Sequence, residues 1–220
     1  MNIRPFDLKE DIRAVERIWY ECGWVENEEQ AAIVRDFLSA GSCIVGCLDG
    51  TPECQVHTVP GTMHYLDEPL SLCAVTAVTT SRVARRQGFA RTMTAQQLAA
   101  AAEAGAEVAG LGMFDQGFYD LLGFGTGAYD HQFTFDPASL MVAVSYRTPA
   151  RLSRDNWREM HQAMVHRLPN HGAVVLDPPE MLKADLTFTE NGYGLGYFDG
   201  EDLTHFLWFE ARGAHGPYVI

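Results

Sequence analysis

LSLCAVTAVTTSRVARRQGFAR, residues 70–91, is the stretch that decides the fold. Its first half consists mostly of small apolar and β-branched residues without Pro or Gly, which is typical of a buried strand. Arg85, Arg86 and Gly88 follow in a predicted turn, and a helix is expected to begin at Phe89. The stretch therefore predicts a strand, a glycine-containing turn and a helix start in immediate succession.

This succession predicts an anion-binding corner. The first N–H groups of a helix lack intrahelical partners, and the helix macrodipole places partial positive charge there. Gly88 has no Cβ, so a phosphate can approach the backbone closely. Arg85, Arg86 and Arg91 add full positive charge. We interpret the turn as a pyrophosphate site; the alternative is an ordinary strand–helix connection with solvated arginines.

The spacing of the turn excludes two known phosphate motifs, because it contains neither GxxxxGK[ST] nor GxGxxG after the strand. Arg85-x-x-Gly88-x-Ala90 instead resembles the R/Q-x-x-G-x-G/A signature of the GCN5-related N-acetyltransferases (GNAT). In that family this segment grips the pyrophosphate of acetyl-coenzyme A (acetyl-CoA). The resemblance implies an α/β (α+β) protein with the GNAT acyl-CoA N-acyltransferase fold, a mixed, mostly antiparallel sheet flanked by helices.

Composition limits the classes of partner. A chain of 220 residues with 47% hydrophobic and 20% charged residues is expected to be a soluble globular protein of one large or two small domains. The longest apolar runs are shorter than a membrane span and the N-terminus lacks a signal-peptide core, so we expect a cytoplasmic protein with no membrane partner. The net charge of −13 argues against a nucleic-acid partner. It fits a cationic amine substrate, and it also fits simple solubility.

Cysteines and histidines show no metal-binding pattern. The five cysteines include no CxxC pair and are expected to be reduced thiols: Cys22, Cys43, Cys47, Cys54 and Cys73. His57, His64, His161 and His166 are scattered without ligand spacing. We therefore expect no metal.

Hydrophobic periodicity predicts alternating helices and strands in the first 141 residues. Helices are expected at 11–22, 30–38, 89–104 and 116–122. Strands are expected at 3–6, 42–48, 54–59, 70–79, 108–113 and 124–135, with a tight turn at Asp49-Gly50. This order predicts a mixed sheet flanked by helices.

The element order then begins again. Residues 144–168 are typical of a strand followed by a capped helix, and 186–220 of a run of strands with Gly and Asp-Gly turns. We predict a complete GNAT domain over 1–141 and the N-terminal half of a second GNAT-like domain over 142–220. Because no closing helix precedes Ile220, the second copy is expected to be truncated or completed by a partner.

The combination of both halves resembles the enhanced intracellular survival (Eis) branch of the GNAT family. The resemblance is carried by VTTSRVARRQGFAR, by GLGMFDQGFYDLLGFGTG and by the second half-domain. Eis proteins have tandem acetyltransferase folds followed by a sterol-carrier-like domain, and many N-acetylate aminoglycosides and other polyamines. The resemblance implies acetyl-CoA as cosubstrate and a small-molecule amine as substrate. Eis-like proteins are often hexamers, so the resemblance leaves both a monomer and a homo-oligomer as alternatives.

The resemblance also implies cofactor contacts at individual residues. Backbone groups of Val78, Thr79 and Thr80 correspond to coenzyme A contacts. The pyrophosphate turn corresponds to Arg85, Arg86, Gln87, Gly88, Phe89, Ala90 and Arg91. A further contact corresponds to Phe114 and Asp115, although the Eis pattern has a small hydroxylated residue in place of Phe114.

Two groups are expected to act in catalysis. Tyr119, in Phe118-Tyr119-x-x-x-Gly123-Phe124, matches the family tyrosine that protonates the departing thiolate. A tyrosine with its ordinary pKa near 10 is protonated at neutral pH and can supply this proton. The backbone N–H of Thr80, at the strand end, is expected to polarise the thioester carbonyl. The alternative for Tyr119 is core packing.

The amine is expected to bind near an acidic turn. Trp24 could stack on a cation beside Glu26 and Glu28; the alternatives are a core aromatic and a solvated helix start. Eis proteins use as general base a C-terminal carboxylate of the sterol-carrier-like domain, which this sequence does not include, so the base is unassigned. The first functional hypothesis is N-acetylation of a small cationic amine. The others are acetylation of a protein lysine and a non-catalytic acyl-CoA-binding regulatory module.

Overall fold

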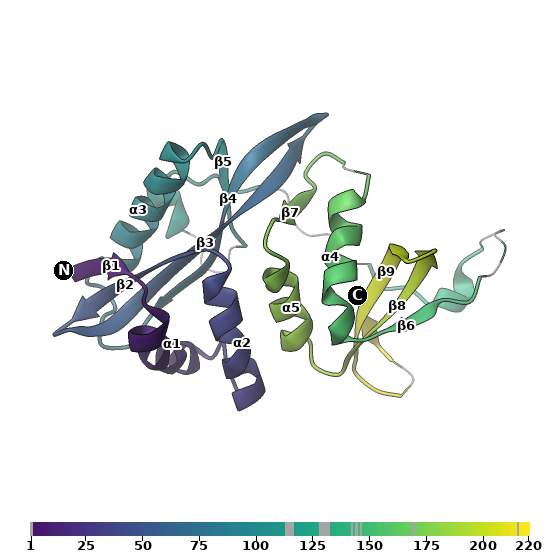
Figure 1. Cartoon of the computed structure of the whole chain (residues 1–220), viewed down its shortest axis with the longest axis horizontal. Coiled ribbons are helices and arrows are strands. Elements are labelled where there is room, and N and C mark those ends of the chain that lie inside the picture. The colour runs from purple at the N-terminus through teal and green to yellow at the C-terminus, as the bar shows by residue number, and fades with distance from the viewer. Residues whose placement is uncertain are drawn as a thin grey trace.

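The computed structural model describes residues 2–112, 117–127, 133–141, 143, 145, 147–168, 170–214 and 216–220. These residues form a six-stranded and a four-stranded sheet, with helices packed on and between them (Figure 1). No helix in this described part is long and apolar enough to cross a membrane.

The first sheet is mixed and mostly antiparallel, as predicted. Its strands, in spatial order, are β1 (Asn2–Pro5), β2 (Ser42–Leu48), β3 (Thr51–Tyr65), β4 (Glu68–Thr80) and β5 (Val108–Gly110), and β7 (Val174–Leu176) also pairs with β3. Only β4 and β5 are parallel to each other among these pairs of described strands. The predicted tight turn between β2 and β3 is confirmed, since Asp49 and Gly50 both have positive φ angles, 47° and 84°.

Helices cover both faces of this sheet (Figure 1). On one face lie α1 (Leu8–Cys22) and α2 (Glu28–Ser39), whose Val15 and Val34 are completely buried in one apolar cluster. On the other face lies α3 (Phe89–Glu103), whose Phe89 and Met93 pack with Val56 of β3. The period-two alternation of β3 therefore serves two cores, one on each side.

The second sheet has the antiparallel order β10-β9-β8-β6. Its strands are β6 (Ala150–Leu152), β8 (Gly192–Asp199), β9 (Asp202–Ala211) and β10 (Tyr218–Val219). Two helices, α4 (Trp157–His166) and α5 (Pro179–Phe188), lie between the sheets, with α4 against β9 and α5 against α2 (Figure 1). Because β7 joins the first sheet, the two halves of the chain are interlocked. The boundary between residues 141 and 142 stays a prediction.

The strand expected at 124–135 does not form in its described parts, since neither 124–127 nor 133–135 is in a strand. Gly125 and Gly127 interrupt the alternation and offer no side chain to pack. Immediately before this segment, the expected short helix is a 3₁₀ turn at Tyr119–Leu122.

The strand expected from residue 186 is also wrong at its start, because Leu186 lies in the last turn of α5. Pro179 occupies the first helical position, where its fixed φ angle favours a helix start. Leu186 is then buried with Met160 in the core under the second sheet, which stabilises the helical arrangement.

An ion pair ties the first strand to the first helix. Arg4 of β1 donates two hydrogen bonds of 2.6 and 2.7 Å to the Asp11 carboxylate of α1. The same carboxylate accepts the Asp7 backbone N–H at 2.8 Å, and its side chain is 1% exposed. Hydrogen bonding to Arg4 holds the pKa of Asp11 below its ordinary value.

We expect Asp11→Asn to lower the free energy of unfolding at pH 7 by about 1–2 kcal/mol, discounted because Arg4 is partly exposed. A depressed pKa in the folded state means that this stabilisation is complete above the unfolded value near 3.9 and is lost as the pH falls through the folded value. Urea denaturation at pH 7, and at steps down to pH 3, measures the free energy of unfolding of both proteins. The difference between wild type and Asp11→Asn should disappear below pH about 4. The exposed neighbour Glu10→Gln is the control. A difference in unfolding free energy that does not change with pH would contradict the ion-pair explanation.

Candidate functional site

The strands β4 and β5 pair over only a short length. β5 lies beside residues 72–74 of β4, and 75–80 have no partner on that side among the described strands. Among the described strands, the C-terminal half of β4 therefore pairs with β3 alone, and its other edge has no strand partner.

A β-bulge in β4 sets which backbone groups face this open edge. Val75 lies opposite Thr58, but Ala77 lies opposite His57, so Thr76 is an extra residue. Because side chains and backbone groups alternate along a strand, one extra residue shifts both alternations for everything that follows.

The direction of the backbone groups beyond the bulge follows from one hydrogen bond. The Ser81 N–H donates to the Glu53 carbonyl of β3 at 2.8 Å. Since this orientation alternates in an antiparallel pair, Thr79 also directs its backbone groups to β3, whereas Val78 and Thr80 direct theirs to the open edge.

The turn between β4 and α3 has an unusual backbone. Arg86 and Gly88 have left-handed φ angles of 62° and 82°. Left-handed residues within a turn can aim successive N–H groups toward one side, which forms an anion-binding concavity. The Gln87 side chain donates to the Val83 carbonyl at 2.9 Å and holds the turn, and the buried ring of Phe89 anchors the start of α3.

A cavity of about 640 Å³ lies at this corner of the molecule. It is lined from α1 and the residues after it, β4, the turn, the start of α3 and the 3₁₀ turn. The lining residues are Cys22, Trp24, Val78, Thr80, Ala84, Arg85, Arg86, Gly88, Phe89, Ala90, Arg91, Phe118 and Tyr119. Most of the residues singled out in the sequence are thus brought together around one hollow.

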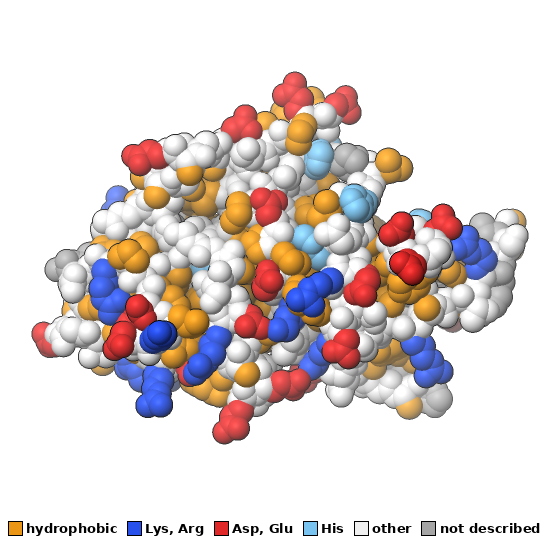
Figure 2. Space-filling model, viewed as in Figure 1, with side chains coloured by type: hydrophobic (Ala, Val, Ile, Leu, Met, Phe, Trp, Pro, Cys, Tyr) orange, Lys and Arg blue, Asp and Glu red, His pale blue; other side chains and the backbone are white. Residues whose placement is uncertain are grey.

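The arginines of this cavity are free to bind an anion. Arg85, Arg86 and Arg91 are exposed, and none of them forms an ion pair with a carboxylate in the described part of the chain. Arg17 and Arg154, by contrast, are paired with glutamates. Figure 2 shows acidic and basic side chains interspersed over one face of the molecule. Guanidinium groups and free helix N–H groups are ligands that suit phosphate.

Tyr119 lines the cavity from the 3₁₀ turn at Tyr119–Leu122. Its ring is 6% exposed and packs edge-on against Phe118 and Phe124, with centroid separations of 4.9 and 5.9 Å. The aromatic contacts fix the ring while one side of it remains at the cavity. Tyr119 is therefore packed against aromatic neighbours and also lines the cavity, and its catalytic role stays a prediction.

Thr80 is flanked by two thiols. Its hydroxyl lies 3.3 Å from Cys54 Sγ, and its carbonyl accepts the Cys22 thiol at 3.7 Å. Burial raises the pKa of Cys54 to about 11, so this thiol is neutral. Cys22, Ala84 and Phe118 line the cavity but were not predicted. Phe118 could have been found from its place beside Tyr119, whereas nothing in the local sequence distinguishes Cys22.

The residues expected to bind the amine are only partly assembled. Trp24 lines the arginine-rich cavity and also an adjoining cavity of about 420 Å³. Glu26 lines the second cavity together with Glu190 and Glu210 from the second half of the chain. Glu28 is exposed at the start of α2 and lines neither cavity.

Two further predicted residues, Thr79 and Gln87, do not line the arginine-rich cavity. Thr79 is buried, and its hydroxyl donates to Gln55 at 3.0 Å on the opposite face of the sheet. Gln87 supports the turn instead. Phe114 and Asp115 lie outside the described residues.

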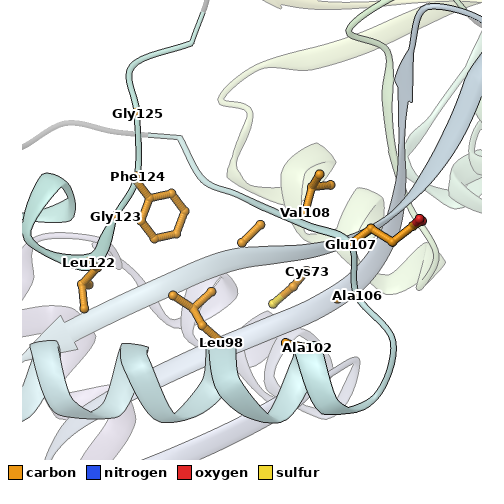
Figure 3. Close-up of a pocket in the computed structure, with 11 residues that line it drawn as sticks. Cys73, Leu98, Ala102, Ala106, Glu107, Val108, Leu122, Gly123, Phe124 and Gly125 are labelled. Carbon is orange, nitrogen blue, oxygen red and sulfur yellow. The ribbon is translucent and has the colours of Figure 1, made fainter.

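A separate cavity of about 370 Å³ lies between α3, β4, β5 and residues 122–125 (Figure 3). Most of the residues around it have apolar side chains, Leu98 and Phe124 among them, and the described residues that line it include no Lys or Arg. The Glu107 carboxylate lies at the rim and accepts the Ser71 N–H at 2.8 Å. This cavity therefore lacks the charge to hold a diphosphate. In the described part of the chain, no group of three or more His, Cys, Asp or Glu is placed to bind a metal.

Comparison with protein families matches residues 2–127 to the family described as "Acetyltransferase (GNAT) domain". The match covers more than half of the chain and includes β1 to β5, the arginine turn and Tyr119. No curated protein sequence matches the chain significantly.

Solved structures share the fold at low sequence identity. A probable N-acyltransferase from Enterococcus faecalis V583 is 16% identical, with a TM-score of 0.72 over 99% of this chain and 56% of that one. Eis1 from Mycobacterium abscessus is 17% identical, with a TM-score of 0.71 over 98% of this chain and 55% of that one. The aminoglycoside N-acetyltransferase AAC(6')-Iy, solved with CoA, is 10% identical, with a TM-score of 0.51 over 61% of this chain and 93% of that one.

The first two alignments run through both sheets, and this chain spans about half the length of those proteins. The fold expected from the sequence, a GNAT domain followed by part of a second one, is confirmed. The chain belongs to the GNAT acetyltransferase family and has an Eis-like fold.

Proposed function

We propose that this protein transfers the acetyl group of acetyl-CoA to a primary amine of a small cationic molecule. The observation that carries the proposal is the convergence of three features on one cavity. They are arginines at a helix start and an edge of β4, both without a partner among the described residues, and Tyr119. Family membership supplies the general reaction class, and these features supply the specific roles.

The arginine turn holds the diphosphate of the cosubstrate in this proposal. Arg85, Arg86 and Arg91 donate charged hydrogen bonds, and the first N–H groups of α3 donate neutral ones. Val78 and Thr80 direct backbone groups to the open edge of β4, where an extended arm can hydrogen-bond as an added strand would. When bound, acetyl-CoA supplies the activated acetyl group.

The proposed chemistry is direct attack on the thioester. The amine nitrogen forms a bond to the acetyl carbon, and the Thr80 N–H stabilises the negative charge that develops on the carbonyl oxygen. The carbon–sulfur bond then breaks, and the Tyr119 hydroxyl gives its proton to the departing sulfur. The amine loses its own proton to a carboxylate or through water.

The preference for a cationic amine rests on the two adjoining cavities. Trp24 lines both cavities. Three glutamates line the one of about 420 Å³: Glu26, Glu190 and Glu210, the last of which also pairs with Arg212. An aromatic face and carboxylates attract a cation, whereas the arginines attract an anionic cosubstrate. The net charge of −13 raises the local concentration of cations further.

Arg86→Ala should weaken the binding of coenzyme A about 10- to 100-fold, because a charged hydrogen bond to phosphate is lost. Isothermal titration calorimetry of the purified protein measures this directly. Arg13→Ala, which removes an exposed arginine of α1 outside the cavity, should leave the affinity unchanged. Equal affinities for wild type and Arg86→Ala would show that the diphosphate binds elsewhere.

Tyr119→Phe should lower kcat by about 10²- to 10⁴-fold while keeping the affinity for coenzyme A, because only proton transfer is lost. Release of coenzyme A thiol can be followed with polyamines, aminoglycosides and lysine peptides as acceptors. Tyr20→Phe alters a tyrosine that is 43% exposed on α1 and serves as the control. Undiminished turnover in Tyr119→Phe would remove the assigned role.

The same acceptor panel separates the alternative functions. Turnover with lysine peptides alone would favour a protein-lysine acetyltransferase. Binding of acetyl-CoA without thiol release for any acceptor would refute the catalytic proposal and favour a regulatory binding module.

A further inference from the structure

We propose that two buried polar side chains of β3, Gln55 and His57, are positioning residues for acetyl transfer. They fix the bulge and the end of β4, so that the amides of Val78 and Thr80 face the cavity. Neither side chain lines that cavity. This inference rests on the proposed function, because it concerns the same thioester site.

Gln55 connects the end of β4 to α1. Its side chain is fully buried, and its Oε1 accepts two hydrogen bonds, from Trp19 Nε1 at 3.1 Å and from Thr79 Oγ1 at 3.0 Å. Thr79 stands between Val78 and Thr80. A fixed Thr79 side chain therefore fixes the orientation of the two amides on either side of it.

His57 holds the bulge itself. Its Nδ1 lies 2.7 Å from Oγ1 of Thr76, the extra residue, and this hydroxyl also donates to the His57 carbonyl at 3.3 Å. The Thr76 hydroxyl has a single proton, which it donates to the His57 carbonyl. We therefore assign a proton to His57 Nδ1, which donates it to the Thr76 hydroxyl oxygen. The ring of Phe37 in α2 covers the imidazole at a centroid distance of 4.9 Å. The bulge is thus closed by a two-bond ring and covered by an aromatic side chain.

Burying these polar side chains lowers the stability of the core. Burial lowers the pKa of His57 to about 4, so the imidazole is neutral at physiological pH. His57 Nε2 and Gln55 Nε2 are buried without a well-aligned hydrogen bond among the described residues, although His57 also interacts with the Leu38 backbone and Gln55 with the Cys43 thiol. An apolar side chain of similar size would avoid this cost. Position, rather than stability, is therefore the better account of why polar groups occupy these two places.

The bulge matters because it shifts the alternation of β4 by one residue. Without an extra residue at Thr76, Thr79 rather than Thr80 would direct its N–H to the open edge. The amide proposed to stabilise the carbonyl oxygen would then point to β3. A displacement of the order of 1 Å at such a donor can lower a rate about 100-fold.

The experiment compares His57→Leu and Gln55→Leu with wild type. Each should lower kcat per folded molecule by about 10- to 100-fold, because the oxyanion donor is misplaced. The affinity for coenzyme A without an acetyl group should stay within about 2-fold, since the arginine turn is untouched. His57→Asn should restore most of kcat, because the Asn amide nitrogen stands as many bonds from Cα as His Nδ1 does.

A matched control separates positioning from stability. His161 of α4 is also buried, at 5% exposure, and its Nε2 lies 2.8 Å from the Leu176 carbonyl, away from β4. His161→Leu should lower the melting temperature but leave kcat per folded molecule unchanged. An equal loss of kcat in His161→Leu would identify a general stability effect and overturn the inference.

A second readout does not depend on turnover. The infrared carbonyl frequency of ¹³C-labelled acetyl-CoA should fall on binding to wild type, and this fall should be smaller in His57→Leu. If wild type binds acetyl-CoA but acetylates no amine, the proposed function fails and the carbonyl frequency alone decides this inference. Unchanged kcat and frequency in both leucine variants would overturn it. A wild-type protein that does not bind acetyl-CoA would overturn both proposals.

Discussion

The site depends on one constraint, which is that one edge of β4 has no partner among the described strands beyond its short contact with β5. Backbone N–H and C=O groups are rarely left without partners inside a sheet, and an open edge is the usual place for an extended molecule to add. The bulge at Thr76 then selects Val78 and Thr80 as the residues that face this edge. The turn, the helix start and Tyr119 lie around this edge and line the same cavity.

Electrostatics divides the region around Trp24 into two parts. One cavity is lined by arginines without carboxylate partners in the described chain, and the adjoining one is lined by glutamates. An anionic cosubstrate would be drawn to the first cavity and a cationic acceptor to the second, both of which Trp24 lines. This arrangement agrees with the proposed reaction, in which the two must meet at the thioester.

The second half of the chain is part of this architecture. β7 pairs with β3, and Met181 and Ala184 of α5 are buried in the same core as α1 and α2. Lys183 of α5 also forms an ion pair with Asp36 of α2. Through these contacts the second half brings Glu190 and Glu210 to the adjoining cavity that Trp24 and Glu26 also line.

The sequence by itself determined the features that depend on local chemistry: the apolar strand, the Arg85-to-Gly88 turn and the helix from Phe89, because hydrophobic period and glycine backbone freedom act within a few residues. Tertiary structure alone decided the bulge at Thr76, the roles of Gln55 and His57 and the joining of β7 to the first sheet. The alternation of polar Gln55 and His57 with apolar neighbours resembles a strand with one solvent-exposed face. Only the packing of α1 and α2, which precede β3 in the chain, buries that face and lets its polar side chains support β4.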